Sequence, residues 1–176
     1  MRRLLAYAVA LIAVLAPPAR AAELKDPREP EVRRLIERYF LSWSNQDLDR
    51  YGQCFLPNAA VQLLDANGAL TTLPLGPFLQ SQREAHRQAV NRLTETAETV
   101  DVRFEGKVAR VVVYWKLVGS EVDEYGYDHF TLINAGDRWR IANLLFYPDP
   151  DGPQQDAEKT PAATDPASAT PKPTAR

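Results

Sequence analysis

The sequence has few of the residues that cross-link a fold or bind metals. A single cysteine, Cys54, excludes an intrachain disulfide, so the core has to be held by packing alone. Histidine occurs only as His86 and His129, and no carboxylate–histidine spacing resembles a metal site. A net charge of -2 provides no basic surface for nucleic acid. We therefore expect no metal, no cofactor and no nucleic-acid partner.

A long apolar run is also missing, because the N-terminal one covers only residues 4–16 and is too short to span a bilayer comfortably. It follows a basic start and precedes a small-x-small motif at residues 19–21, the pattern of a signal peptide. We predict that residues 1–21 are removed and that the protein is exported, to the periplasm or beyond. Its contact with the membrane would then come only from the export signal. The alternative is an uncleaved anchor.

The C-terminal segment, residues 149–176, contains no aromatic residue and no Leu, Ile or Val. Pro, Ala, Thr and Asp dominate it, and such a composition cannot bury enough apolar surface to offset the entropy of ordering. We predict a disordered tail. A linker over residues 22–30 and one folded domain over residues 31–148 make up the rest.

The domain begins with a strongly amphipathic stretch over residues 31–44. Its apolar residues recur at helical spacing and include three aromatics: Val32, Leu35, Ile36, Tyr39, Phe40 and Trp43. A short second helix is expected after Asp47, as an N-cap, then a strand over residues 60–64. A third helix should open at Gly76-Pro77, with His86 on its inner stripe.

From Thr94 onward the apolar period changes from helical spacing to two, which is typical of strands. One long strand should bury Val111, Val113 and Trp115, and two more strands follow it. Helices gathered on one face of such a meander make an α+β fold. We expect a cone-shaped, curved antiparallel or mixed sheet wrapped around the long N-terminal helix, with a cavity between them.

Two motifs, S-N-Q-D-L-D-R-Y at residues 44–51 and G-D-R-W-R-I at residues 136–141, resemble the nuclear transport factor 2-like superfamily and its SnoaL-like group. The resemblance covers about residues 31–147 and implies the same curved sheet. This superfamily contains isomerases, dehydratases, cyclases, hydrolases and binding modules, so its fold alone does not choose a function.

A more distant resemblance to the ketosteroid isomerase branch implies site residues. Arg38-Tyr39 followed by Asp47-Leu48-Asp49 matches the first-helix pattern of that branch, which places Tyr39 on its oxyanion tyrosine. Asp128 falls on its oxyanion aspartic acid. The general-base position falls on Leu63, which cannot accept a proton.

The residues themselves support part of this interpretation. Tyr39 lies on the apolar stripe of the first helix, so its hydroxyl needs a buried partner. Asp128 shares a strand face with Phe130 and Leu132, where an ionised carboxylate is unfavourable and a raised pKa is expected. In the alternative register His129 points inward and is a base candidate. A further alternative makes Tyr39 a core residue and leaves Asp128 exposed.

Three functions remain open at this point. The first is a binding module for a small, mostly apolar ligand, contacted by Trp43, Leu63, Phe104, Trp115, Phe130 and Asn143. The second is a lyase or isomerase for an enolisable substrate, with Tyr39 and Asp128 as donors and His129 or His86 as the base. The third is an interaction module, possible as a homodimer, that uses the open sheet face around Val112, Tyr114 and Val118.

Overall fold

A computed structural model describes residues 26–153 apart from residues 122 and 137. The predicted signal peptide and most of the predicted tail lie outside these residues. Three helices and six strands follow in the order α1 (Glu29–Ser44), α2 (Leu48–Gly52), β1 (Phe55–Leu64), β2 (Leu70–Pro74), α3 (Leu75–Gln88), β3 (Thr94–Glu105), β4 (Val108–Val118), β5 (Glu124–Asn134) and β6 (Trp139–Pro148). Among the described residues, no helix combines the length and apolarity needed to cross a bilayer.

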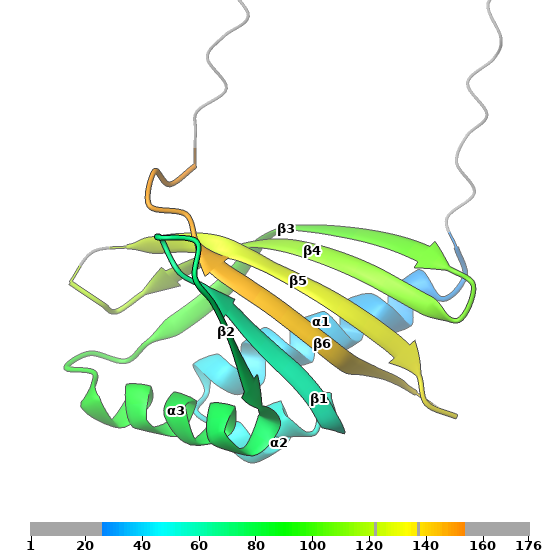
Figure 1. The fold of residues 1–176 in the computed structure, drawn as a ribbon, viewed down its shortest axis with the longest axis horizontal. Coiled ribbons are helices and arrows are strands. Elements are labelled where there is room, and N and C mark those ends of the chain that lie inside the picture. The colour runs from blue at the N-terminus through cyan, green and yellow to red at the C-terminus, as the bar shows by residue number, and fades with distance from the viewer. Residues whose placement is uncertain (1–25, 122, 137, 154–176) are drawn as a thin grey trace, which may run out of the picture.

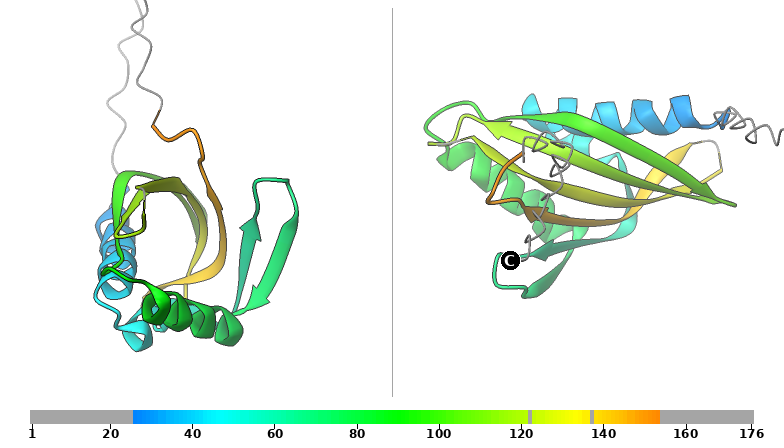
Figure 2. Two further views of the ribbon diagram at one scale, coloured as in Figure 1. Left: turned by 90° about the vertical axis from the view of Figure 1, so that its left-hand side faces the viewer. Right: turned by 90° about the horizontal axis from the view of Figure 1, so that it is seen from above.

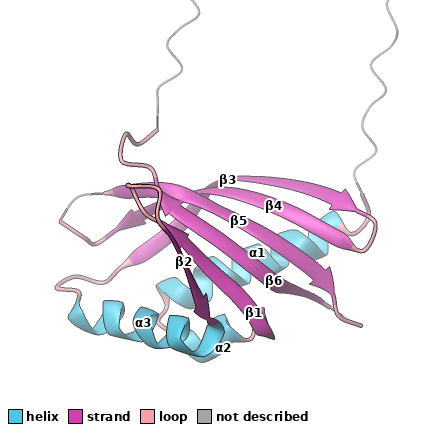
Figure 3. Cartoon of the chain, in the orientation of Figure 1, coloured by secondary structure: helices cyan, strands magenta, loops and turns pink. Residues whose placement is uncertain are grey.

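The strands form one sheet in the order β2-β1-β6-β5-β4-β3 (Figure 1). Only β1 and β6 pair in parallel, and every other neighbour pair is antiparallel. The helices form a separate layer on one side of the sheet (Figure 3), and the sheet curls strongly, with α1 running beside β3 (Figure 2). This mixed, curved sheet beside a long helix confirms the predicted α+β fold.

The inner face of the sheet packs on the apolar stripe of α1. Every member of that predicted stripe is buried, from Val32 to Trp43. On the opposing strand β4, Val111, Val113 and Trp115 are buried as predicted. The main core therefore forms between the apolar stripe of α1 and the inward-facing residues of the strands.

Several local predictions were wrong. β2 had no counterpart in the prediction, and β1 begins five residues early, at Phe55. Phe78 of α3 is buried, but Ala85 is exposed, and the exposed Val90 lies beyond the end of α3 at Gln88. The predicted cap of α2 is confirmed, since the Asp47 carboxylate accepts from the Arg50 amide at 3.0 Å.

Candidate functional site

A cavity of about 260 Å³ lies between the helices and the inner face of the sheet. Half of its lining residues are aromatic, and its polar groups are carboxyls, tyrosine hydroxyls, indole N–H groups and one amide. The lining residues are Tyr39, Trp43, Tyr51, Phe78, Gln82, Glu95, Trp115, Leu117, Glu124, Asp128, Phe146 and Pro148. Small-molecule sites commonly combine apolar walls with a few convergent polar groups in this way.

Asp128 enters the cavity from the inner face of β5. Only 3% of its surface is exposed, and its Oδ2 has no hydrogen-bond partner among the described residues. Burial raises the pKa of this carboxyl to about 7, while the Tyr39 hydroxyl and the Trp115 indole N–H lower it to a smaller extent. The burial of Asp128 confirms the predicted register of β5. Its raised pKa means that Asp128 changes its protonation near neutral pH.

Glu95 supplies a second carboxyl, and the sequence analysis missed it. The Ser44 hydroxyl fixes its backbone, because Ser44 Oγ accepts from the Glu95 amide at 2.9 Å and donates to its carbonyl at 3.0 Å. Burial, and then the charge on Asp128, raise the pKa of Glu95 well above its ordinary value.

A β-bulge explains why Glu95 was missed. Val100, Val102 and Phe104 put the even positions of β3 inward, and strict alternation would place Glu95 outward. The pairing with β4 shifts between Ala97 and Thr99, so the face changes there. Glu95 stands opposite Leu117, another cavity residue. No turn residue marks this bulge in the sequence.

Two tyrosines from separate helices meet above Asp128. Tyr39 of α1 and Tyr51 of α2 have ring centroids 4.7 Å apart, and Tyr39 also meets Phe130 edge-on at 5.0 Å. Burial is the main cause that raises the pKa of both phenols, so both keep their protons and can donate hydrogen bonds. Tyr51 was predicted only as a face residue of the second helix.

The indole of Trp115 lies against β5 beside Asp128. Gly126 makes room for it, since a Cβ at this glycine would lie 2.2 Å from Trp115 Cζ2. Trp115 is 7% exposed, and its Nε1 is buried without a partner among the described residues. The indole N–H and the Asp128 carboxyl thus lie in the same cavity, each with unused hydrogen-bonding capacity.

Side chains from α1 and α3 form the wall nearest the helices. Trp43 Nε1 donates to Gln82 Oε1 at 2.8 Å, which fixes both side chains. The His86 ring packs against Trp43 with ring centroids 4.3 Å apart and a tilt of 51° between the rings, and His86 does not line the cavity. Burial lowers the pKa of His86. His86 therefore supports Trp43 and does not line the cavity.

The predicted ligand-binding residues separate into two groups. Trp43 and Trp115 line the cavity, whereas Phe130 lies beneath Tyr39 in the core. The others also lie outside the lining, and they are Leu63, Phe104 and Asn143. Phe104 packs on Trp139, with centroids 5.8 Å apart, at a part of the inner face remote from Asp128.

Asn143 lies outside the cavity because of a second bulge. The pairing of β5 with β6 shifts between Thr131 and Leu132, so Ile141 and Leu144 both face the core. Asn143 instead donates to Ala60 O at 3.3 Å and to Gln62 Oε1 at 3.2 Å, across to β1. The predicted alternation of β6 was wrong beyond this point.

His129 lies on the outer face of the sheet, so the register that turned it inward was wrong. There it joins an outer aromatic cluster, defined as Tyr114, Tyr125, Tyr127, His129 and Tyr147. Its Nε2 lies 3.3 Å from the Tyr147 hydroxyl. It cannot act on a ligand held in the cavity, since the sheet separates the two.

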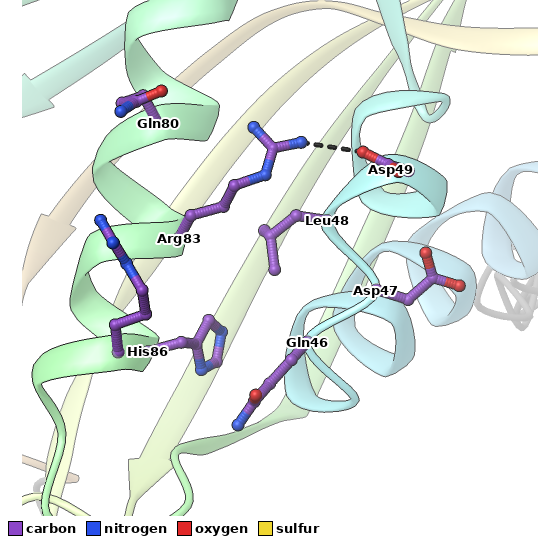
Figure 4. Close-up of a pocket in the computed structure, with 8 residues that line it drawn as sticks. Gln46, Asp47, Leu48, Asp49, Gln80, Arg83 and His86 are labelled. Atoms are coloured by element: carbon purple, nitrogen blue, oxygen red, sulfur yellow. Dashed lines mark hydrogen bonds and ion pairs between the residues drawn. The ribbon is translucent and has the colours of Figure 1, made fainter.

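A wider groove of about 590 Å³ runs between α2 and α3 (Figure 4). Its charged side chains pair with one another: Arg83 binds Asp49 at 2.8 Å, and Arg87 binds Glu84. The groove is shallow and open to solvent, and these exposed ion pairs contribute little energy. We therefore assign the candidate site to the smaller cavity around Asp128.

Comparison with known proteins identifies the family of the chain. Residues 27–147 match the family described as "Putative lumazine-binding". The chain belongs to this family. The match with the "Putative lumazine-binding" family spans α1 to β6 and so includes every residue that lines the cavity except Pro148. No curated protein matches the sequence.

Solved structures share the fold at low sequence identity. An NTF2-like protein from Shewanella oneidensis is 20% identical with a TM-score of 0.55, over 68% of this chain and 98% of its own. An NTF2-like protein with a cystatin-like fold from Novosphingobium aromaticivorans is 15% identical with a TM-score of 0.58, over 72% and 84%. These likenesses confirm the predicted fold.

Proposed function

We propose that this protein is an exported domain that binds a small, flat, mostly apolar ligand in the cavity around Asp128. One observation carries the proposal: a buried carboxyl with an unpaired oxygen stands inside an aromatic cavity. A buried polar atom without a partner is unfavourable, and a bound ligand that donates to it would remove that penalty. Aromatic walls favour a flat ring system.

The family description supports the same class of ligand. Lumazine is a flat, bicyclic heterocycle with N–H and carbonyl groups, so it combines a stacking surface with hydrogen-bonding edges. The cavity offers both features, through Trp43 and Trp115 as ring surfaces and Asp128 as an acceptor. Lumazine is therefore a suitable first probe.

Calorimetric titration with lumazine tests this proposal. The wild type should show saturable binding, and Asp128→Leu should weaken it by at least about tenfold, because it removes a charged hydrogen-bond partner. His129→Leu is the matched control, since it changes the next residue on the opposite face and should leave binding unchanged. Absence of saturable binding to the wild type, or equal affinity in both variants, would contradict the proposal.

A second candidate is a lyase or isomerase for an enolisable substrate. Tyr39 and protonated Asp128 would stabilise a developing oxyanion, and Glu95 favours this candidate because it adds a second carboxyl to the cavity. Hydrogen–deuterium exchange at the α-carbon of a bicyclic ketone such as tetralone tests it. Exchange should exceed the buffer rate and fall in Tyr39→Phe. Exchange at the buffer rate would reject catalysis and leave ligand binding untouched.

A homodimer is a separate proposal and rests on the outer face. The outer aromatic cluster and its apolar neighbour Val112 are only half-buried in the monomer, although they are large and clustered. Such surfaces favour association. Sedimentation of the wild type and of Tyr127→Glu tests this proposal. The wild type is expected to be a dimer and the variant a monomer, and a monomeric wild type would exclude the homodimer.

A further inference from the structure

Two polar atoms in the cavity lack hydrogen-bond partners among the described residues, and they are of opposite kinds. Asp128 Oδ2 is an acceptor, and Trp115 Nε1–H is a donor. Both residues are more than nine-tenths buried. Each unpaired buried group is unfavourable by itself, and few such groups occur in folded proteins. Their presence together in one ligand-sized cavity indicates what the cavity is built to receive.

The two atoms belong to side chains that the sheet holds near each other. Trp115 and Asp128 both point inward from adjacent strands, with Trp115 opposite Gly126 and Val113 opposite Asp128. The absence of a side chain at Gly126 lets the indole lie beside the carboxyl. The N–H is close enough to favour the carboxylate form of Asp128, yet neither atom completes a hydrogen bond with the other.

The other polar groups of the cavity do not fill this role. On α3, the Gln82 carbonyl already accepts from Trp43. Glu95 on β3 and Glu124 on β5 are carboxyls, while Tyr39 on α1 and Tyr51 on α2 bring hydroxyl donors from the helix side. Trp115 and Asp128 combine a fixed donor with an unpaired acceptor on one wall. The ring of Trp115 cannot rotate freely, because it is packed against the β5 backbone.

We propose that the cavity selects flat ring ligands that carry an N–H donor next to a carbonyl acceptor on one edge, the pattern of a lactam or a cyclic imide. The ligand N–H would donate to Asp128 Oδ2, and the ligand carbonyl would accept from Trp115 Nε1. This inference rests on the proposed function, since it names the chemical class of the ligand bound there. It makes Trp115 and Asp128 a specificity-determining pair.

A series of bicyclic probes of nearly equal shape tests this pairing. Isoquinolone carries the N–H and the carbonyl on one edge, N-methylisoquinolone lacks the donor, and naphthalene lacks both. Isoquinolone should bind the purified wild type at least about tenfold more tightly than either of the others, from hydrogen bonds that only it can make. Competition by the three compounds against a fluorescent naphthalene dye gives their relative affinities.

Substitution of two of the three buried tryptophans sharpens the test. Trp115→Phe keeps an aromatic ring and removes the N–H, so it should lower isoquinolone affinity about tenfold and leave naphthalene affinity nearly unchanged. Trp139→Phe is the matched control, because Trp139 Nε1 is also buried and unpartnered but lies outside the cavity. It should change neither affinity.

The outcomes separate this inference from the proposed function. Equal binding of all three probes would overturn the donor–acceptor pairing and leave an apolar binding cavity. Failure of all three to bind would overturn both. Equal weakening by Trp115→Phe and Trp139→Phe would show a general loss of packing and would also overturn the assignment of the indole N–H. The probe series on the wild type decides the matter even if Trp115→Phe does not fold.

Discussion

Asp128 and His129 are adjacent in the chain, yet they stand in aromatic clusters on opposite faces of β5, and the two clusters differ in how their polar groups are satisfied. On the outer face, His129 meets the Tyr147 hydroxyl, and the Tyr114 hydroxyl donates to Asp149 at 3.1 Å. On the inner face, Asp128 Oδ2 and the indole N–H of Trp115 have no hydrogen-bond partners within the part of the chain that the structure describes. Aromatic residues alone therefore do not mark a site, and the inner face differs because it also has a cavity lined by a carboxyl with an unpaired oxygen.

The largest expected difference between the two faces is that the inner face, through Asp128, makes the stability of the fold depend on pH. Folded Asp128 keeps its proton up to a pKa of about 7, against an ordinary value of 3.8. The folded state therefore binds more protons in this window, and its stability falls as pH rises, by up to roughly 4 kcal/mol between pH 4 and 7. The raised pKa of half-buried Glu95 acts in the same direction.

Urea unfolding at several pH values checks this expectation. Asp128→Asn should reduce the slope and be more stable than the wild type above pH 7, because it removes a buried charge. Tyr127→Phe, in the outer aromatic cluster, is the control and should keep the wild-type slope. An unchanged slope in Asp128→Asn would show that the carboxyl titrates normally and would remove the contrast between the faces.

A smaller difference is expected for two neighbouring leucines on β6. Leu144 is fully buried on the inner face, whereas Leu145 is half-buried on the outer face. Leu144→Ala should lower the free energy of unfolding by about 3 kcal/mol, through lost burial and a cavity. Leu145→Ala should lower it by less than about 1 kcal/mol. Denaturant unfolding measures both, and equal losses would place the bulge of β6 elsewhere.

The smallest expected effect concerns the hydroxyls of two tyrosines. Tyr39 lowers the pKa of Asp128, so Tyr39→Phe should raise that pKa above about 7. Tyr127→Phe removes a hydroxyl on the outer face and should leave the carboxyl unchanged. Carbon NMR of the labelled Asp128 side chain reads the titration directly. A lower or equal pKa in Tyr39→Phe would mean that this hydroxyl does not face the carboxyl.

Part of the site could be predicted because it follows from local patterns in the sequence. The stripe of α1 placed Tyr39 and Trp43 on the inner side. The alternation of β5 placed Asp128 on the same face as Phe130 and on the face opposite to His129. Both elements are regular over these residues, so the period in the sequence gives the correct face for each side chain. Tyr51 and Gln82 lie on elements that face the cavity, but nothing in their spacing separates a lining residue from a core residue.

Glu95 and Asn143 show where sequence patterns fail. Each follows or precedes a bulge, and each bulge exchanges the inner and outer faces of its strand. An extra residue in a ladder changes parity, and the pairing partner that reveals it is distant in sequence. Strict alternation therefore hid a cavity carboxyl at Glu95 and predicted a cavity amide at Asn143 that lies on the other side.

The sequence by itself determined the class of fold, the inner stripe of the first helix and the face on which Asp128 lies, because these follow from periodicity within single elements. Only the tertiary structure decided that Glu95 meets Asp128, that Tyr51 meets Tyr39, and that Gly126 leaves room for the Trp115 indole. These contacts join α1, α2, β3, β4 and β5, and they depend on strand register and sheet curvature. Register and curvature arise from pairing between distant segments, so no local pattern specifies them.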